Sequence, residues 1–164
     1  MKLFTAVILS VLLLCGCSQA PSEQEVLEII TAYNKAKYEL NQEEFSLGDK
    51  EELHPLINER VKKWLTENDY KKFWNNRDAG ITVEEAKRGR IIQIKDIKIG
   101  KLAPTDDNKA LNVEYTMVYA ATIRESNQTT EYQVNGQATV VMENDTLKID
   151  RHWDSLNWKE LGLP

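Results

Sequence analysis

The spacing of the apolar residues changes near Gly89, and this change limits the folds open to the chain. Before Gly89 the apolar residues recur every three or four positions, as on one face of a helix. After it they recur every second position, as on one face of a strand. Helices followed by four consecutive long strands predict an α+β fold, in which N-terminal helices pack on a curved, four-stranded antiparallel meander.

The first two helices have recognisable starting signals. Ser22–Glu25 has the pattern of a capping box, so the first helix is expected to begin there and to run to about Asn41. Pro55 is tolerated only in the first turn of a helix, because it lacks an amide proton and clashes with a preceding turn. The second helix is therefore expected to begin near His54.

Two shorter helices are expected before the strands begin. Thr66 has the sequence context of a helix cap, and the helix after it would point Tyr70, Phe73 and Trp74 inward. Thr82 has a similar context and would cap one or two final turns. The paired carboxylates that follow such caps are expected in first turns, where the helix dipole favours them. These pairs are Glu51–Glu52 and Glu84–Glu85.

The strand half shows two irregularities. In the first strand the isoleucines change parity, and a β-bulge near Lys95–Asp96 would return all of them to one face. Asn135–Gly136 could form a tight hairpin turn, but both flanks keep the same parity, which favours one strand bent at Gly136. The remaining strands alternate cleanly, over residues 111–123 and 147–153.

The N-terminus has the layout of an export signal. An apolar run from Leu3 to Leu14 follows Lys2. Its core of about 12 residues is shorter than the roughly 20 needed to span a bilayer. The run closes on Leu14-Cys15-Gly16-Cys17, and this layout resembles the signal peptide and lipobox of bacterial lipoproteins.

That resemblance implies cleavage after residue 16 and a thioether-linked diacylglycerol on Cys17. Cys15 is the poorer acceptor, because the residue before it is the bulky Leu14 whereas Gly16 precedes Cys17. An ordinary secreted protein and an uncleaved anchor are the alternatives. The expected organisation is a signal peptide over 1–16, a lipidated short tether over 17–21 and a single α+β domain over 22–164. The expected localisation is extracytoplasmic, anchored by lipid to the bacterial cell membrane.

The charge balance restricts the partners. The full chain has 21 Lys and Arg against 26 Asp and Glu, and loss of residues 1–16 removes only Lys2, which leaves a net charge of −6. An acidic chain argues against nucleic acid, whose binders show basic patches. It also leaves the diacylglycerol on Cys17 to supply the affinity for the membrane.

The order of elements resembles the nuclear transport factor 2-like superfamily over about residues 22–156. The features that carry this resemblance are the amphipathic helices, a long bulged strand and three alternating strands that end in Lys148-Ile149-Asp150-Arg151-His152-Trp153. The resemblance implies a cone-shaped domain whose sheet curls around a long helix and leaves a pocket between them. A cystatin-like or other helix-on-sheet domain is the alternative. The tail over 154–164 is expected to pack back as a short helix.

Aromatic residues would line such a pocket. Tyr115, Tyr119 and Tyr132 share the inward parity, and Tyr33 and Trp64 join them from the helices. Their hydroxyls could orient a small apolar ligand, and the alternative is an ordinary core with hydroxyls satisfied at its edge.

The last strand offers the remaining candidates. Arg151 and Trp153 have the inward parity, and a buried Arg needs a carboxylate partner or a wet cavity, so Arg151 could bind an anion at the pocket mouth. The alternatives are a residue that leans to solvent or a second bulge. Asp150, His152 and Asp154 fall on the opposite face, where a solvated surface is favoured over a zinc site. No catalytic residue, metal or cofactor is expected.

These observations favour a non-catalytic binding or protein-interaction module of the cell envelope, anchored through Cys17. Its partner would be an envelope protein or a small apolar ligand. The superfamily resemblance implies an alternative, an isomerase or dehydratase that uses the cone pocket. A second alternative is an envelope inhibitor or immunity-type accessory, whose acidic surface would suit a basic partner.

Overall fold

The computed structural model describes residues 21–156, and within them the helices precede the strands. The helical segments are α1 (Glu23–Tyr38), α2 (Gln42–Phe45), the 3₁₀ turn η1 (Lys50–Glu52), α3 (Leu53–Lys62), α4 (Glu67–Asn76) and α5 (Gly80–Lys87). The strands are β1 (Arg90–Pro104), β2 (Ala110–Ile123), β3 (Thr129–Glu143) and β4 (Thr146–Asp154). The expected signal peptide, Cys17 and the tail beyond Leu156 lie outside the described residues.

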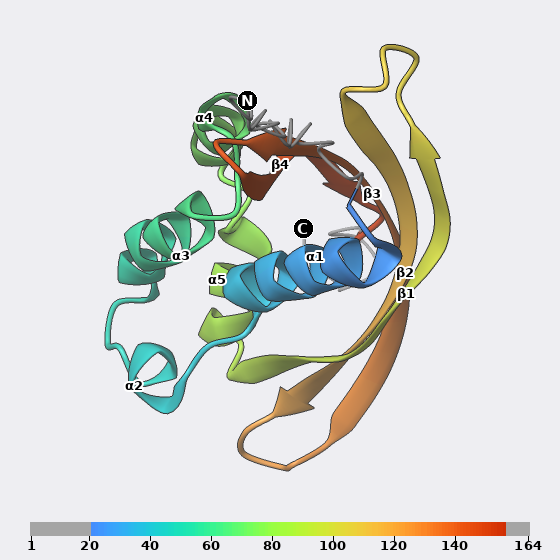
Figure 1. The fold of residues 1–164 in the computed structure, drawn as a ribbon. Coiled ribbons are helices and arrows are strands. Elements are labelled where there is room, and N and C mark those ends of the chain that lie inside the picture. Colours follow the sequence, from blue (N-terminus) through green and yellow to red (C-terminus); the bar gives the residue numbers. More distant parts are fainter. Residues whose placement is uncertain (1–20, 157–164) are drawn as a thin grey trace, which may run out of the picture.

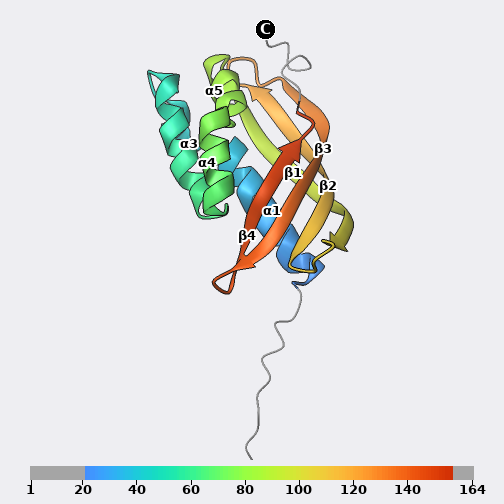
Figure 2. The ribbon, with the colours of Figure 1, turned by 90° about the horizontal axis from the view of Figure 1, so that it is seen from above.

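The strands form one antiparallel sheet in the order β1-β2-β3-β4. Figure 1 shows the sheet curving around α1, and Figures 1 and 2 both place α3 on the far side of α1 from β1, β2 and β3. Helix α4 contacts β4, and α5 contacts β1. The α+β meander with helices on its concave side is confirmed.

The helix starts follow the capping residues in two of three cases. Ser22 and Glu25 make the full capping box of α1, and the Thr66 hydroxyl accepts from Asp69 N at the start of α4. Thr82 is not a cap, because α5 already begins at Gly80 and the Thr82 hydroxyl donates to the Lys37 carbonyl oxygen at 2.9 Å. Tertiary contact with α1 therefore decides the position of α5.

Two side chains in the helical half differ from the predicted placement. Trp74 is 49% exposed, whereas Phe73 on the same helix is completely buried. Glu85 lies in the middle of α5 rather than in its first turn, and it is buried beside Arg90, whose guanidinium is 3.4 Å away.

The sheet contains the predicted bulge and two further irregularities. The pairing of β1 with β2 shifts between Ile94 and Asp96, as predicted, and again between Ile99 and Lys101. β3 is one continuous strand through Gly136, also as predicted. A glycine is required there, because a Cβ at Gly136 would lie 2.1 Å from the Tyr115 ring on the neighbouring strand.

The third irregularity reverses the faces of β4. Thr139 pairs with Arg151 and Val140 pairs with Ile149, which leaves Asp150 as the extra residue of a bulge. Ile149 is fully buried, but beyond the bulge the inward positions belong to His152 and Asp154. The predicted inward parity of Arg151 and Trp153 is therefore wrong.

Candidate functional site

The side chains of the predicted pocket fall into separate environments. Tyr33 and Tyr119 are 1% and 2% exposed and belong to the core, and the Tyr115 hydroxyl is 3.4 Å from Asn34 Nδ2 on α1. Tyr132 is half-buried and stacks on Tyr119 with ring centroids 5.1 Å apart. Tyr33, Tyr115 and Tyr119 thus fill the space beneath the sheet, with Tyr132 stacked on Tyr119, so these four residues do not line an open hollow.

The other three predicted residues lie elsewhere. Trp64 lines a groove between α1 and α3. Arg151 is exposed on the outer face of the sheet, and Trp153 is 53% exposed. The structure therefore does not bring the seven residues into one pocket.

The inner end of β4 instead carries a buried ion pair. Asp154 Oδ2 accepts from Lys37 Nζ at 3.0 Å and from the Tyr38 hydroxyl at 2.7 Å, and Leu156 N donates to the other oxygen. The side chains of Lys37 and Asp154 are only 6% and 7% exposed. The acidic tip of β4 is thus bonded to the last turn of α1.

His152 forms a second polar cluster beside this pair. Its Nδ1 lies 2.7 Å from Asp69 on α4, and its Nε2 lies 3.3 Å from Asp78, which follows α4. The ring centroid is 5.0 Å from that of Tyr33 and 5.9 Å from that of Phe73. With a carboxylate on each nitrogen, the geometry suits an imidazolium that donates twice.

The pKa values agree with this interpretation. Burial lowers the pKa of His152, but the hydrogen bonds to Asp69 and Asp78 outweigh burial, and the pKa stands above its ordinary value. Burial raises the pKa of Asp154, but Lys37 and the Tyr38 hydroxyl outweigh it and hold this pKa below its usual range. Both shifts favour the charged forms, the imidazolium of His152 and the carboxylate of Asp154.

These groups reach the surface at a cleft of about 270 Å³, lined among others by Lys37, Arg77, Asp78, His152 and Asp154. In this arrangement His152 is not placed to act as a general base. A histidine that donates from both nitrogens has no lone pair with which to act as a base. Within residues 21–156, no group of three His, Cys, Asp or Glu side chains is placed to hold a metal ion.

Sequence reasoning missed this cluster. The alternation along the last strand predicts a solvated face for His152 and Asp154, and nothing in the sequence marks Asp69 as their neighbour. The one signal in the sequence is that burying the unpaired charge of Arg151 costs free energy. A second bulge turns this side chain outward and so avoids that cost. The partners of His152 could not be identified without knowing that α4 packs on β4.

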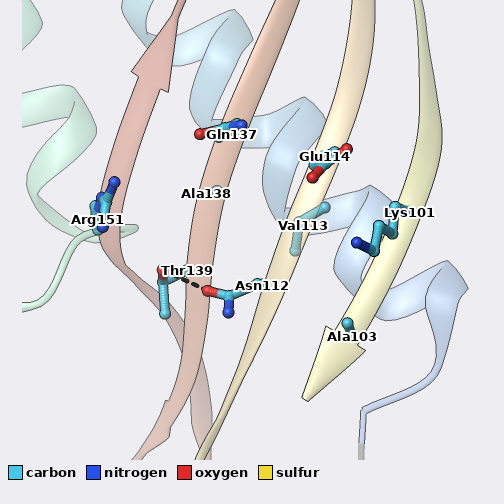
Figure 3. A pocket seen from close by; sticks show the side chains of 9 residues that line it. All are labelled: Lys101, Ala103, Asn112, Val113, Glu114, Gln137, Ala138, Thr139 and Arg151. Atoms are coloured by element: carbon cyan, nitrogen blue, oxygen red, sulfur yellow. Dashed lines mark hydrogen bonds between the residues drawn. The ribbon is translucent and has the colours of Figure 1, made fainter. Parts of the chain in front are cut away.

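A polar hollow of about 320 Å³ lies across the outer face of all four strands, and we call it the outer hollow. Figure 3 shows Arg151 at one side and Lys101 at the other, with Gln137 and Glu114 between them. The remaining lining residues are Ala103, Asn112, Val113, Ala138 and Thr139. Within residues 21–156, neither Arg151 nor Lys101 forms an ion pair, so both cations can meet a partner.

Comparison with known proteins identifies the fold but no family. The sequence matches no protein-family model and no curated protein sequence. The periplasmic domain of DotI superposes with a TM-score of 0.58 at 10% identity, over 85% of this chain and 99% of that one.

Two further solved structures share the arrangement. The transfer protein TraH from the Gram-positive conjugative plasmid pIP501 has a TM-score of 0.53 at 16% identity, over 85% of this chain and 98% of that one. The intermembrane space region of the chloroplast protein ARC6 has a TM-score of 0.51 at 17% identity, over 83% and 98%. At these identities the likeness shows the fold alone.

Proposed function

We propose that the chain is a lipid-anchored, extracytoplasmic protein that acts as a non-catalytic interaction module of the bacterial cell envelope. The observation that carries this proposal is the filled concave side of the sheet. Tyr33, Tyr119, Phe73, Met117 and Ile149 are all less than 2.5% exposed there, so large side chains occupy the space that a small-molecule pocket would need. Recognition is then left to the outer surface.

The anchor rests on the lipobox at Cys17 and on the start of the fold. The capping box begins α1 at Ser22, so only residues 18–21 separate the lipid from the domain, a reach of at most about 14 Å. Two acyl chains anchor stably, because each buried methylene contributes about 0.8 kcal/mol. No helix within residues 21–156 is both long and apolar enough to cross a membrane.

The structural neighbours agree with an envelope role. The DotI domain is periplasmic, the ARC6 domain belongs to an intermembrane space, and TraH is a putative transfer protein of a conjugative plasmid. We infer that this chain uses the same fold on the outer side of a membrane to contact another protein.

The outer hollow is the surface we assign to that contact. Its two cations, Lys101 and Arg151, have no ion-pair partner within the described part of the chain, and Glu114, Gln137 and Asn112 offer hydrogen-bonding groups between them. Polar groups spread over four strands suit a protein partner more than a small apolar ligand.

An enzyme acting in the cone is the weaker proposal. His152 and Asp154 do lie on the inner face, but both nitrogens of His152 face carboxylates and Asp154 accepts from three donors. Catalysis would require these bonds to break first. An inhibitor or immunity-type accessory is a narrower form of the proposed module, and the identity of the partner would distinguish it.

The test is co-purification from cross-linked, detergent-solubilised envelopes of the native host, with a tagged full chain. We expect a protein to be enriched with the wild type and with Lys72→Glu on α4, and at least tenfold less of it with Arg151→Glu. Enrichment of no protein, or equal enrichment with Arg151→Glu, would contradict the proposal. Cys17→Ser should release the chain from the membrane fraction, and its retention there would refute the lipid anchor.

A further inference from the structure

A second groove lies on the opposite side of the molecule, between α1 and α3. It has a volume of about 410 Å³, with Ala32, Ala36 and Leu40 among its apolar lining residues. Its polar lining includes Lys35 and Glu39 from the α1 side and Arg60, Lys63 and Trp64 from the α3 side. We call this surface the α1–α3 groove, and it shares no residue with the outer hollow.

The groove contains buried hydrogen-bond donors that have no acceptor. Arg60 Nε donates to the Ala36 carbonyl oxygen at 2.7 Å, and Nη1 donates to both carboxylate oxygens of Glu44 at 2.9 Å. Its Nη2 is buried without a partner within the described residues, and so is Nε1 of Trp64. A buried donor left unsatisfied is costly, so a shift of the Arg60 or Trp64 side chain that brings its free N–H to an oxygen acceptor in the groove would be favoured.

The charges of the groove also favour a ligand that brings an anionic oxygen acceptor. Lys35 and Lys63 form no ion pair within residues 21–156, and the Lys63 ammonium lies 4.7 Å from the centre of the Trp64 ring. The single carboxylate of the lining, Glu39, already accepts from Ile94 N at 2.8 Å. Arg60 is already paired with Glu44, so Lys35 and Lys63 are the two lining cations that have no ion pair within the described residues, in a chain whose net charge is −5.

We infer that the α1–α3 groove binds an acidic segment of another protein through its carboxylates. A carboxylate oxygen is the acceptor that Arg60 Nη2 and Trp64 Nε1 lack, and planar carboxylates suit a guanidinium. Cations on two helices can meet several carboxylates along one peptide, and the small side chains of Ala32 and Ala36 leave room for its backbone. This inference goes beyond the proposed function and does not depend on the outer hollow.

The indole proton of Trp64 gives a direct readout of binding. The full lipidated chain is labelled with ¹⁵N-tryptophan in zwitterionic nanodiscs and titrated with N-acetyl-tetraglutamate amide, and the Trp64→Phe variant assigns the signal. We expect the Trp64 indole resonance to shift in a saturable way, while those of Trp74 and Trp153 stay in place. Tetraglutamine, of the same length but uncharged, should give no shift.

Charge variants on the same chain test the assignment further. Removing both groove lysines, with Lys35→Ala and Lys63→Ala, should weaken tetraglutamate binding at least tenfold, whereas Lys71→Ala with Lys72→Ala on α4 should not. An unshifted Trp64 signal, or an equal shift with tetraglutamine, would overturn the inference. Inorganic phosphate acting as strongly as the peptide would replace the acidic segment by a small-anion site. Because the co-purification test uses Arg151 instead, the two proposals can fail separately.

Discussion

The buried pair between Lys37 and Asp154 allows the sharpest quantitative prediction. Asp154→Ala removes the carboxylate and leaves the Lys37 ammonium in a site where its side chain is 6% exposed. It also removes the acceptor of the Tyr38 hydroxyl. Breaking one partner of a buried pair costs about 3–5 kcal/mol, because the remaining charge is uncompensated.

In a domain of this size 1 kcal/mol corresponds to about 2–4 °C in Tm, so Asp154→Ala should lower the Tm by about 6–20 °C. The assay is thermal unfolding of the full chain in detergent, followed by near-ultraviolet circular dichroism. The matched control is Asp96→Ala, which removes the exposed partner of Lys98. The Lys98 side chain is 79% exposed and the Asp96 side chain is 50% exposed. An exposed pair contributes less than about 1 kcal/mol, so the control should lose at most about 4 °C.

A double variant separates charge burial from packing. Lys37→Met with Asp154→Leu replaces both charges by apolar groups, which is often neutral or stabilising for a buried pair. Its Tm should therefore exceed that of Asp154→Ala. A destabilising buried charge at Lys37 is excluded if Asp154→Ala shifts the Tm no more than Asp96→Ala does, or if the double variant is less stable than Asp154→Ala.

Three further predictions concern the same unfolding assay. Gly136→Ala should destabilise the fold by about 1–3 kcal/mol, because its Cβ would collide with the Tyr115 ring. A Cβ at Gly48 meets no atom within 4 Å, so the control Gly48→Ala should change the stability little. Equal effects of the two substitutions would contradict the close packing at Gly136. Because the folded-state pKa of His152 is raised, its stabilising contribution is fully present below the unfolded pKa of about 6.5 and is lost as pH rises through the folded pKa. The Tm difference between wild type and His152→Gln should therefore shrink as the pH rises above about 6.5, and a constant difference would exclude this linkage. Ser22→Ala should cost about 1 kcal/mol through loss of the capping box, and an unchanged Tm would show that this cap adds no stability.

The features that could be predicted from the sequence are those fixed by nearby residues. The capping box at Ser22 needs only Glu25, three residues away. The bulge between Ile94 and Asp96 follows from the parity of isoleucines within one strand. The continuity of β3 through Gly136 likewise follows from the parity of its two flanks.

The features that could not be predicted depend on distant partners. The bulge at Asp150 exists only in the pairing of β4 with β3, and it exchanges the faces of Arg151 and His152. The buried position of His152 depends on Asp69, which is 83 residues away in the chain. A pattern within β4 contains no information about either contact, so simple alternation predicts the wrong face for Arg151, His152 and Trp153.

Site-specific photo-cross-linking tests the proposed interaction most directly. A photoreactive residue is placed at Gln137, in the outer hollow, or at Asn75, an exposed position on α4, in the full lipidated chain in its native envelope. We expect Gln137 to give a discrete covalent adduct with one envelope protein and Asn75 to give at least tenfold less of it. The proposed interaction through the outer hollow would be contradicted by no adduct from Gln137, or by equal adducts from both positions.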